Sequence, residues 1–271
     1  MIDEVSGAPT ISAPLRFERV GHVAILTLNR PAAGNAIDVA VADAILAAAL
    51  ECDADIDVRC VVLTGVGRMF CAGGDVGAFA AAGDALPALV KRLTAPLHAG
   101  IAKLLRMDKP LVTAINGAAA GAGLGLAIMG DVVLAARSAK FTAAYGGLGL
   151  SPDAGLSWML PRLVGLQQAK RLTLLGERID AGEAERIGMV SRLVDDDALP
   201  STMMDLAADL TRFSGSAWRR TRNLLLASFD SELEAQMERE GQAIARSAAG
   251  ADGREGIAAY LEKRQPEFGR N

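Results

Sequence analysis

The chain has 271 residues, and its 28 Lys and Arg against 32 Asp and Glu give a net charge of −4. This acidic balance argues against a nucleic-acid-binding protein, because such proteins usually carry a basic excess. Apolar residues make up 51% of the chain, aromatic residues only 4%, and glycine occurs 29 times. We therefore expect a compact core of small aliphatic side chains, in one large domain or in a domain with an appendage.

Histidine and cysteine are too few and too scattered for a metal site or a disulfide scaffold. His22 and His98 lie far apart, and the three cysteines form no CxxC pair. We expect no metal, and we interpret the protein as cytoplasmic, where thiols stay reduced. Residues 1–14 carry two acidic residues and no apolar run, which is typical of a flexible head and not of a signal peptide. The most apolar stretch, 117–130, falls short of the ~20 residues of a membrane span, so we expect no membrane partner.

Strands and helices are predicted to alternate in the first part of the chain. Residues 15–20 and 22–29 have the pattern of a β-hairpin, and Asp38 can cap a helix that extends to Leu50. Further along, buried strands are predicted at 60–64, 110–115 and 132–135, with a long amphipathic helix over 84–107 that Pro87 or Pro96 interrupts. These patterns predict an α/β fold.

The pattern changes near residue 196. After a strand predicted at 189–194 no strand pattern remains, and helices are predicted at 198–213, 217–229, 232–246 and 253–263. We therefore divide the chain into a head (1–14), an α/β core (15–196) and a C-terminal helical region (197–271).

Two glycine-rich turns each follow a predicted strand and precede a helix. The first, 69–75, contains Phe70, Gly73, Gly74 and Asp75, and the second, 116–125, contains Gly121. Small residues let a ligand approach the main chain, and the first N–H groups of a helix have no acceptor within it. Two such turns could direct two N–H groups at one oxygen, as in an oxyanion hole for a carbonyl that becomes an enolate. The alternative is that these glycines only allow close helix–strand packing.

Four ordered motifs resemble the enoyl-CoA hydratase/isomerase (crotonase) family. They are FCAGGDV, KPLVTAINGAAAGAGLGLAIMGDVVLAARSAKF, GLGLSPDAGLSWMLPRLVG and LLGERIDAGEAERIGMVSRLV. The resemblance extends from Leu15 to Phe268 and implies a core of repeated ββα units, a C-terminal helical region, and homotrimers or dimers of trimers. It also implies acyl-CoA thioesters as substrates, with coenzyme A as part of the substrate and no separate cofactor. The family's two oxyanion donors fall on the amides of Ala72 and Ala122.

The chain departs from this family at the positions of two glutamates. Hydratases of the family carry one in the helix after the second glycine-rich turn and one after the following strand, and these places hold Gly125 and Tyr145 here. Hydration needs a group that orients and deprotonates water, and a proton for the neighbouring carbon. Without this pair of carboxylates we do not expect hydration by the usual route.

One carboxylate remains, in the segment Ser151-Pro152-Asp153. Asp153 matches the acid of the family's Δ3,Δ2-enoyl-CoA isomerases and of the ring isomerases of phenylacetate degradation. The resemblance implies that Asp153 removes a proton from C2 of a 3-enoyl thioester and returns it at C4. The alternative interpretation of the residues is that Asp153 caps the helix that follows.

Other residues are candidates for substrate contact. Tyr145 could donate a hydrogen bond to the substrate or line the pocket, and Trp158 could form part of an apolar wall. By the resemblance, Tyr260 and Lys263 match an aromatic residue and a lysine near the CoA of a neighbouring subunit. His98 we interpret as a packed or surface residue. The predicted substrate contacts are Phe70, Gly73, Gly74, Asp75, Gly121, Tyr145, Trp158, Tyr260 and Lys263.

These observations predict an acyl-CoA isomerase, either a Δ3,Δ2-enoyl-CoA isomerase or an epoxyphenylacetyl-CoA isomerase. Two alternatives stay open: an enoyl-CoA hydratase with atypical catalytic residues, and a non-catalytic oligomer that binds acyl-CoA.

Overall fold

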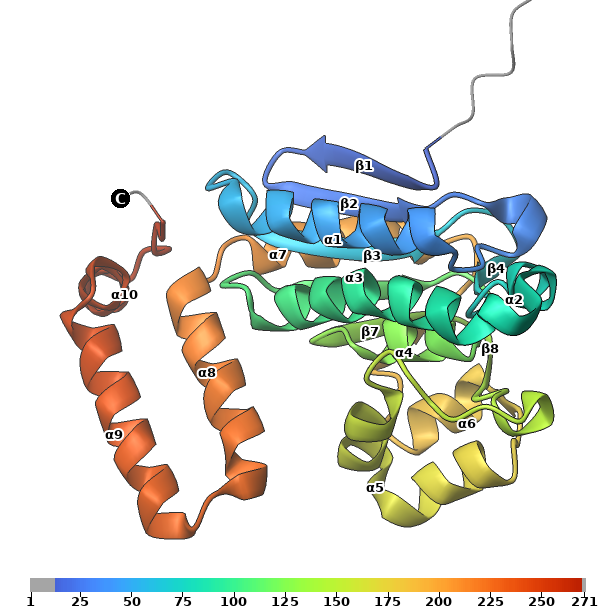
Figure 1. The fold of residues 1–271 in the computed structure, drawn as a ribbon. Helices are drawn as coiled ribbons and strands as arrows, with labels where there is room; N and C mark the ends of the chain where they lie inside the picture. Colours follow the sequence, from blue (N-terminus) through green and yellow to red (C-terminus); the bar gives the residue numbers. More distant parts are fainter. Residues whose placement is uncertain (1–12, 270–271) are drawn as a thin grey trace, which may run out of the picture.

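The computed structural model describes residues 13–269, so the predicted head (1–14) lies almost entirely outside the described residues. Figure 1 shows an α/β core from which a helical arm projects at the C-terminal side. Within the described part of the chain, no helix combines the length and the hydropathy that a membrane crossing requires.

A large sheet has the strand order β1-β2-β3-β5-β7-β10. β1 and β2 form the expected antiparallel hairpin, and the remaining neighbours pair in parallel. The apolar runs of β3 and β5 are buried along almost their whole length, as parallel strands covered on both faces require. The strands are β1 (Leu15–Val20), β2 (Val23–Leu28), β3 (Cys60–Gly65), β5 (Leu111–Ile115), β7 (Val132–Ala136) and β10 (Arg192–Val194).

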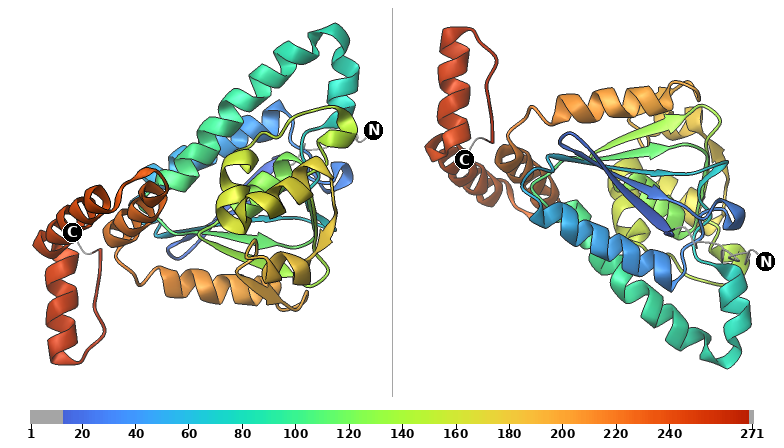
Figure 2. Two further views of the ribbon diagram at one scale, coloured as in Figure 1. Left: turned by 90° about the horizontal axis from the view of Figure 1, so that it is seen from below. Right: turned by 90° about the horizontal axis from the view of Figure 1, so that it is seen from above.

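Alternate side chains of the large sheet point into two different cores. On one face, Leu26 and Leu63 belong to the core that includes α1 (Val39–Ala54) and α3 (Leu86–Arg106). On the other face, Val62 packs in the core that includes α7 (Leu199–Leu210). Figure 2 shows α1 and α3 together on one side of the sheet and α7 on the opposite side. The first helix of the predicted C-terminal region thus packs on the core.

Two helix predictions need correction. Asp38 caps α1 through the Val41 amide, as expected, but α1 continues past Leu50 to Ala54. The predicted interruption of the long helix is wrong, because α3 runs through Pro96 and holds Pro87 in its first turn. Proline is tolerated in the first turn, where its missing N–H would have no acceptor in the helix anyway.

A small sheet, in the order β4-β6-β8-β9, lies beside the large one. β4, β6 and β8 are parallel neighbours, and β9 is antiparallel. These strands are too short to show a periodicity, and the sequence did not predict β4, β6 or β8. Each follows a strand of the large sheet and precedes a helix, which confirms the repeated ββα units. The elements are β4 (Met69–Cys71), β6 (Ala118–Ala120), β8 (Lys140–Thr142), β9 (Ile179–Asp180), α2 (Val76–Ala82), α4 (Ala122–Ile128), α5 (Leu156–Leu174) and α6 (Ala181–Arg186).

The arm consists of α8 (Gly215–Ala227), α9 (Leu233–Ala249) and α10 (Ala251–Glu262), close to the predicted bounds. Arg222 anchors α8 to the core. Its guanidinium is nearly buried, pairs with the Asp131 carboxylate, and donates to the carbonyl oxygens of Leu105, Met107 and Lys109. A cation at these carbonyls, where α3 ends, also suits the negative end of the helix dipole.

All three cysteines are buried and unpaired. Burial raises the pKa of Cys52, Cys60 and Cys71 to about 12 in each case. Their side chains therefore pack as small apolar groups with the proton kept on sulfur.

We predict that Arg222→Leu lowers the free energy of unfolding by about 3–5 kcal/mol, because the Asp131 carboxylate loses the nearly buried cation that pairs with it and three carbonyl groups lose a donor. Urea denaturation measures this change. Arg219→Leu is the matched control, since Arg219 pairs with Asp108 at the surface with side chains 44% and 47% exposed, and the loss there should stay below about 1 kcal/mol. Equal losses in the two variants would contradict the anchoring role of Arg222.

Candidate functional site

The two glycine-rich turns lie side by side. β4 and β6 are parallel neighbours, so the segments that follow them leave the small sheet at the same edge. A Cβ placed on Gly73 would lie only 2.7 Å from the Ala120 carbonyl oxygen and 3.3 Å from the Ala122 nitrogen. Gly73 also has a φ of +94°. Glycine is thus required here both for backbone conformation and for the close approach of the second turn.

The structure changes the assignment of one of the two free N–H donors and keeps the other, Ala122. The Ala72 amide, predicted to be one of them, donates to the Gly34 carbonyl oxygen at 2.9 Å. By contrast, the amides of Gly74 and Ala122 have no acceptor among the described residues, and both residues line one cavity of 210 Å³. The available pair is therefore Gly74 and Ala122. The contact that occupies Ala72 comes from a residue far away in the sequence, so sequence reasoning could not exclude it.

The cavity is walled mainly by apolar side chains and contains one carboxylate among its described lining residues, that of Asp153. Leu148 and Leu150 both belong to this wall. Gly121 and Tyr145 also line it, so the structure brings both glycine-rich turns, Tyr145 and Asp153 together. The other apolar side chains of the wall come from α2 and α3 and are Val76, Phe79, Val90 and Leu93.

Tyr145 holds the Asp153 carboxylate. Its hydroxyl donates to Oδ1 of Asp153 at 2.6 Å. Burial, and after it the charge of Asp153, raise the pKa of Tyr145 far above its usual range, so the phenol keeps its proton and remains a donor. Oδ2 of Asp153 accepts no hydrogen bond from the described residues. One carboxylate oxygen is thus fixed, and the other is available.

The capping alternative for Asp153 is not what the structure shows. α5 begins at Leu156 with Gly155 in the N-cap position, and no side chain caps this end. Asp153 contributes only its carbonyl oxygen, which accepts from the Leu156 amide at 3.0 Å. Its carboxylate points instead to Tyr145.

Gly73 and three other predicted contacts of the core do not line this cavity. Phe70 is fully buried in the core. Asp75 caps α2 through the Ala78 amide and pairs with Arg30, and these contacts hold the pKa of its carboxyl below its usual range. Trp158 lies at the surface beneath the Arg162 guanidinium, 4.1 Å from the ring centroid, and lines a different cavity.

Tyr260 and Lys263 lie at the end of α10, on the arm, and Tyr260 is 84% exposed. They do not line the cavity of Asp153, and their contact with the CoA of a neighbouring subunit stays a prediction.

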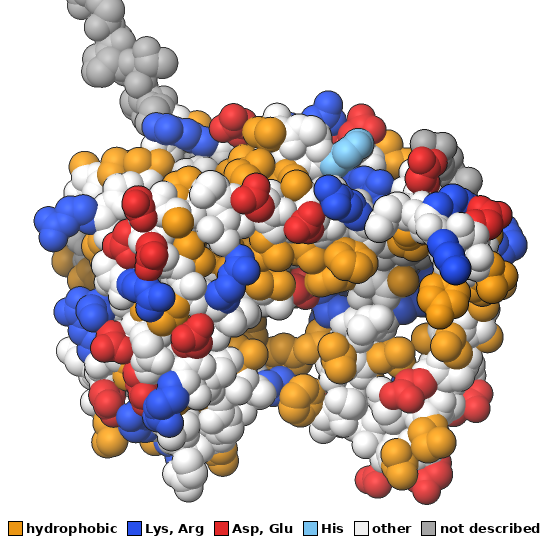
Figure 3. Space-filling model, turned by 180° about the vertical axis from the view of Figure 1, so that it is seen from behind, with side chains coloured by type: hydrophobic (Ala, Val, Ile, Leu, Met, Phe, Trp, Pro, Cys, Tyr) orange, Lys and Arg blue, Asp and Glu red, His pale blue; other side chains and the backbone are white. Residues whose placement is uncertain are grey.

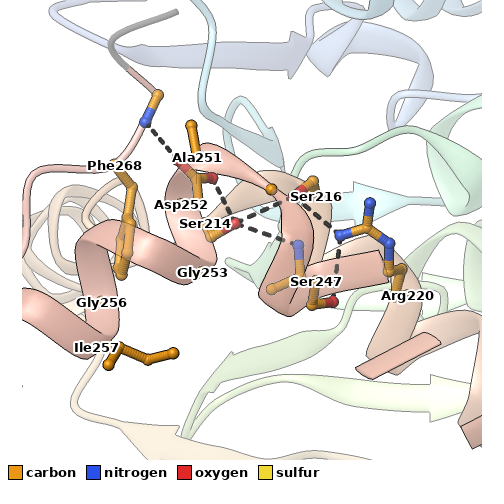
Figure 4. A pocket seen from close by; sticks show the side chains of 13 residues that line it. Ser214, Ser216, Arg220, Ser247, Ala251, Asp252, Gly253, Gly256, Ile257 and Phe268 are labelled. Atoms are coloured by element: carbon orange, nitrogen blue, oxygen red, sulfur yellow. Dashed lines mark hydrogen bonds between the residues drawn. The ribbon is translucent and has the colours of Figure 1, made fainter. Parts of the chain in front are cut away.

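Another cavity, of 520 Å³, lies where α9 meets α10 beside α8 (Figure 4). Its polar groups bond to one another: Ser214 donates to Asp252 at 2.6 Å, and Arg220 donates to Ser216 and to Ser247 at 3.2 Å each. These bonds join the start of α10 to the start of α8. The cavity therefore belongs to the packing of the arm.

The family model described as "Enoyl-CoA hydratase/isomerase" matches residues 18–271. The chain belongs to this family. A "Probable enoyl-CoA hydratase" of Rhodobacter capsulatus is 38% identical over 94% of the chain and 97% of the relative. A "1,2-epoxyphenylacetyl-CoA isomerase" of Escherichia coli is 39% identical over 91% and 94%. The crystal structure of an enoyl-CoA hydratase from Polaromonas sp. JS666 has a TM-score of 0.89 at 33% identity, over 94% of this chain and 99% of that one.

Gly125 occupies the position at which we expect hydratases of the enoyl-CoA hydratase/isomerase family to carry a glutamate. The structure leaves no room for a side chain at this position. A Cβ on Gly125 would lie 2.7 Å from the Ala154 carbonyl oxygen and 3.0 Å from the Ala154 Cβ. Ala154 directly follows Asp153. The loop that carries Asp153 therefore fills the space that the side chain of a glutamate at position 125 would need.

We predict that Gly125→Ala lowers the free energy of unfolding by about 1–3 kcal/mol, because the added methyl group overlaps a backbone carbonyl. Thermal or urea denaturation measures the loss. Gly147→Ala, in the same connecting segment as Asp153, is the matched control, since a Cβ there meets nothing within 4 Å. A Gly125→Ala variant as stable as the control would show that the loop moves aside without cost.

Proposed function

We propose that this protein is an acyl-CoA isomerase that shifts a double bond through a thioester enolate, with Asp153 as acid and base. The observation that carries the proposal is the Asp153 carboxylate, held by Tyr145 at 2.6 Å, in a cavity shared with the free amides of Gly74 and Ala122. A single carboxylate suits an isomerisation, in which one group can remove and return the same proton.

The reaction begins with a 3-enoyl thioester whose carbonyl oxygen accepts hydrogen bonds from the Gly74 and Ala122 amides. Oδ2 of Asp153 removes a proton from C2, and the electron pair delocalises into a dienolate. The two amides stabilise the negative charge on oxygen, where such donors act most strongly in a dry site. Asp153 then returns the proton at C4, which gives the conjugated 2-enoyl thioester. Atoms and charge balance without a metal or redox cofactor, and coenzyme A remains part of the substrate.

Tyr145 has two effects in this scheme. Its hydrogen bond fixes the carboxylate in one orientation, so that Oδ2 carries the proton between C2 and C4. Tyr145 also stands at the position where a hydratase is expected to carry its second glutamate, and its phenol keeps its proton. Water activation by Tyr145 is disfavoured, because the raised pKa keeps its phenol protonated, and a neutral phenol does not accept a proton from water.

The substrate is a linear 3-enoyl thioester or a ring epoxide attached to CoA. The E. coli relative named 1,2-epoxyphenylacetyl-CoA isomerase, at 39% identity, supports the second possibility. The apolar wall formed by Phe79, Leu93 and Leu148 suits either a short chain or a ring. We further propose that the chain forms homotrimers or dimers of trimers, which the exposed apolar side chains of the arm support. These include Leu225, Phe229, Leu233, Met237, Ile257 and Leu261.

We predict that Asp153→Asn lowers kcat for 3-hexenoyl-CoA isomerisation by about 10²–10⁴-fold, the usual contribution of a positioned acid–base group. Absorbance of the conjugated product measures the rate. With substrate deuterated at C2, the wild type should deliver part of the deuterium to C4.

Two results would contradict the isomerase proposal. Crotonyl-CoA hydration at ordinary enzymatic rates would favour the hydratase alternative. Tight binding of acyl-CoA by the wild type without conversion of the linear or the epoxide substrate would favour the non-catalytic alternative.

We predict that Tyr145→Phe lowers kcat by about 10-fold or more, since a hydrogen bond to a charged group contributes about 1.5–3 kcal/mol. KM should change much less, because the phenol bonds the protein's own carboxylate. Steady-state kinetics separate the two parameters. Thr211→Val is the control, because it removes a hydroxyl group that bonds only the Ala208 carbonyl oxygen among the described residues, at the end of α7. A Tyr145→Phe variant with wild-type kcat would show that Asp153 needs no such support.

A further inference from the structure

A cavity of 770 Å³ lies on the far side of Ala154 from the Asp153 carboxylate, between the core and the arm. Figure 3 shows the notch between these two parts, with hydrophobic side chains along its edge. The cavity is lined by residues of α3, of the start of α5 and of α8, among them His98, Ala154 and Arg219. The loop that carries Asp153 is thus the wall between two cavities, and its position depends on contacts from both sides.

His98, on α3, contacts this loop directly. Its Nε2 lies 3.2 Å from the Ala154 nitrogen and accepts the hydrogen bond of that amide. The Ala154 amide has no other acceptor among the described residues. Ala154 is fully buried, so a buried N–H group depends on one imidazole nitrogen. Backbone donors in such places are almost always paired.

The conformation of Ala154 needs this support. Its φ is +51°, in the left-handed region that residues with a Cβ adopt only at a cost and that persists when the surroundings hold it. Gly125 contacts its carbonyl side, and His98 binds its amide. Asp153 directly precedes it. A rotation at Ala154 would therefore move the carboxylate relative to Tyr145 and to the two free amides.

We propose that His98 is a positioning residue for the reaction: by accepting the Ala154 amide on Nε2, it holds the Asp153 loop in place. The predicted effect of His98 on kcat rests on the proposed function, whereas its predicted effect on the position of the loop does not. No hydrogen bond joins His98 to the Asp153 carboxylate among the described residues, and His98 does not line the cavity that contains this carboxylate. Its effect passes through the backbone, and it requires an unprotonated Nε2.

Protonation of His98 reverses the contact. An imidazolium carries a proton on each ring nitrogen and cannot accept at Nε2, so two donors would then face each other. The other charged groups that line this cavity are Arg106 on α3 and Arg219 on α8, the latter paired with Asp108 at 2.8 Å. No titratable side chain of α5 lines the cavity. Acidification should therefore loosen the loop through His98.

The test compares His98→Leu with His98→Gln. Both variants remove the imidazole, but the glutamine carbonyl oxygen can accept the Ala154 amide and the leucine side chain cannot. We expect His98→Leu to lower kcat by about 10- to 100-fold, the effect of a small misplacement of a reacting group, with KM little changed. His98→Gln should recover most of this loss. Equal kcat values in the two variants would overturn the proposal.

The pH profile gives a second readout that a purely structural role would not produce. Wild-type kcat should fall on acidification, because a protonated imidazole cannot accept the Ala154 amide, and His98→Gln, which keeps an acceptor, should lose this part of the fall. The control is His22→Gln, which replaces the other histidine of the chain; His22 contacts the Asp57 carbonyl oxygen, away from this cavity. An unchanged profile in His98→Gln would contradict the proposal.

Hydrogen exchange separates this proposal from the proposed function. The peptide that contains Ala154 should exchange faster in His98→Leu than in the wild type and in His98→Gln, whether or not the enzyme is active on the chosen substrate. Unchanged exchange would overturn the role of His98 and leave the Asp153 mechanism intact. If the wild type does not isomerise the substrate but the variants show the expected exchange pattern, the Asp153 mechanism is overturned and the role of His98 stands.

Discussion

The contact between Gly125 and Ala154 is the constraint on which the candidate site depends. α4 can receive the loop at this distance only because residue 125 has no side chain. The contact brings the residue after Asp153 against the helix whose first amide, that of Ala122, faces the cavity. The absence of a glutamate at position 125 and the placement of the Asp153 carboxylate are thus two results of the same packing contact.

The short parallel strands of the small sheet assemble the rest of the site. β4 leads to Gly74, β6 to Ala122, and β8 to the segment that contains Tyr145 and Asp153. Because neighbouring parallel strands end at one edge, three segments far apart in the sequence reach one cavity. The backbone between β8 and α5 is also held in unusual conformations, with positive φ at both Ala144 and Ala154, as is common where a loop presents functional groups.

Sequence patterns predicted what depends on local periodicity and on motifs. The hairpin, the long buried strands, the helix cap at Asp38 and the arm helices all follow from such patterns, and the motifs indicated the family. The small sheet escaped prediction because strands of two or three residues show no period. The assignment of Ala72 as a donor failed because the Gly34 carbonyl that occupies its amide comes from a distant turn. His98 was interpreted as a packed or surface residue for the same reason, since nothing near it in the sequence points to Ala154.

The three buried thiols have a practical consequence for work on this protein. A thiol that keeps its proton and lies out of reach of solvent reacts slowly with alkylating reagents and peroxides. Modification of Cys52, Cys60 or Cys71 would therefore report opening of the core, so the native cysteines serve as an intrinsic gauge of unfolding. The same inertness makes the natural sequence a suitable background for a single cysteine introduced on the arm, where a fluorescent label could follow assembly.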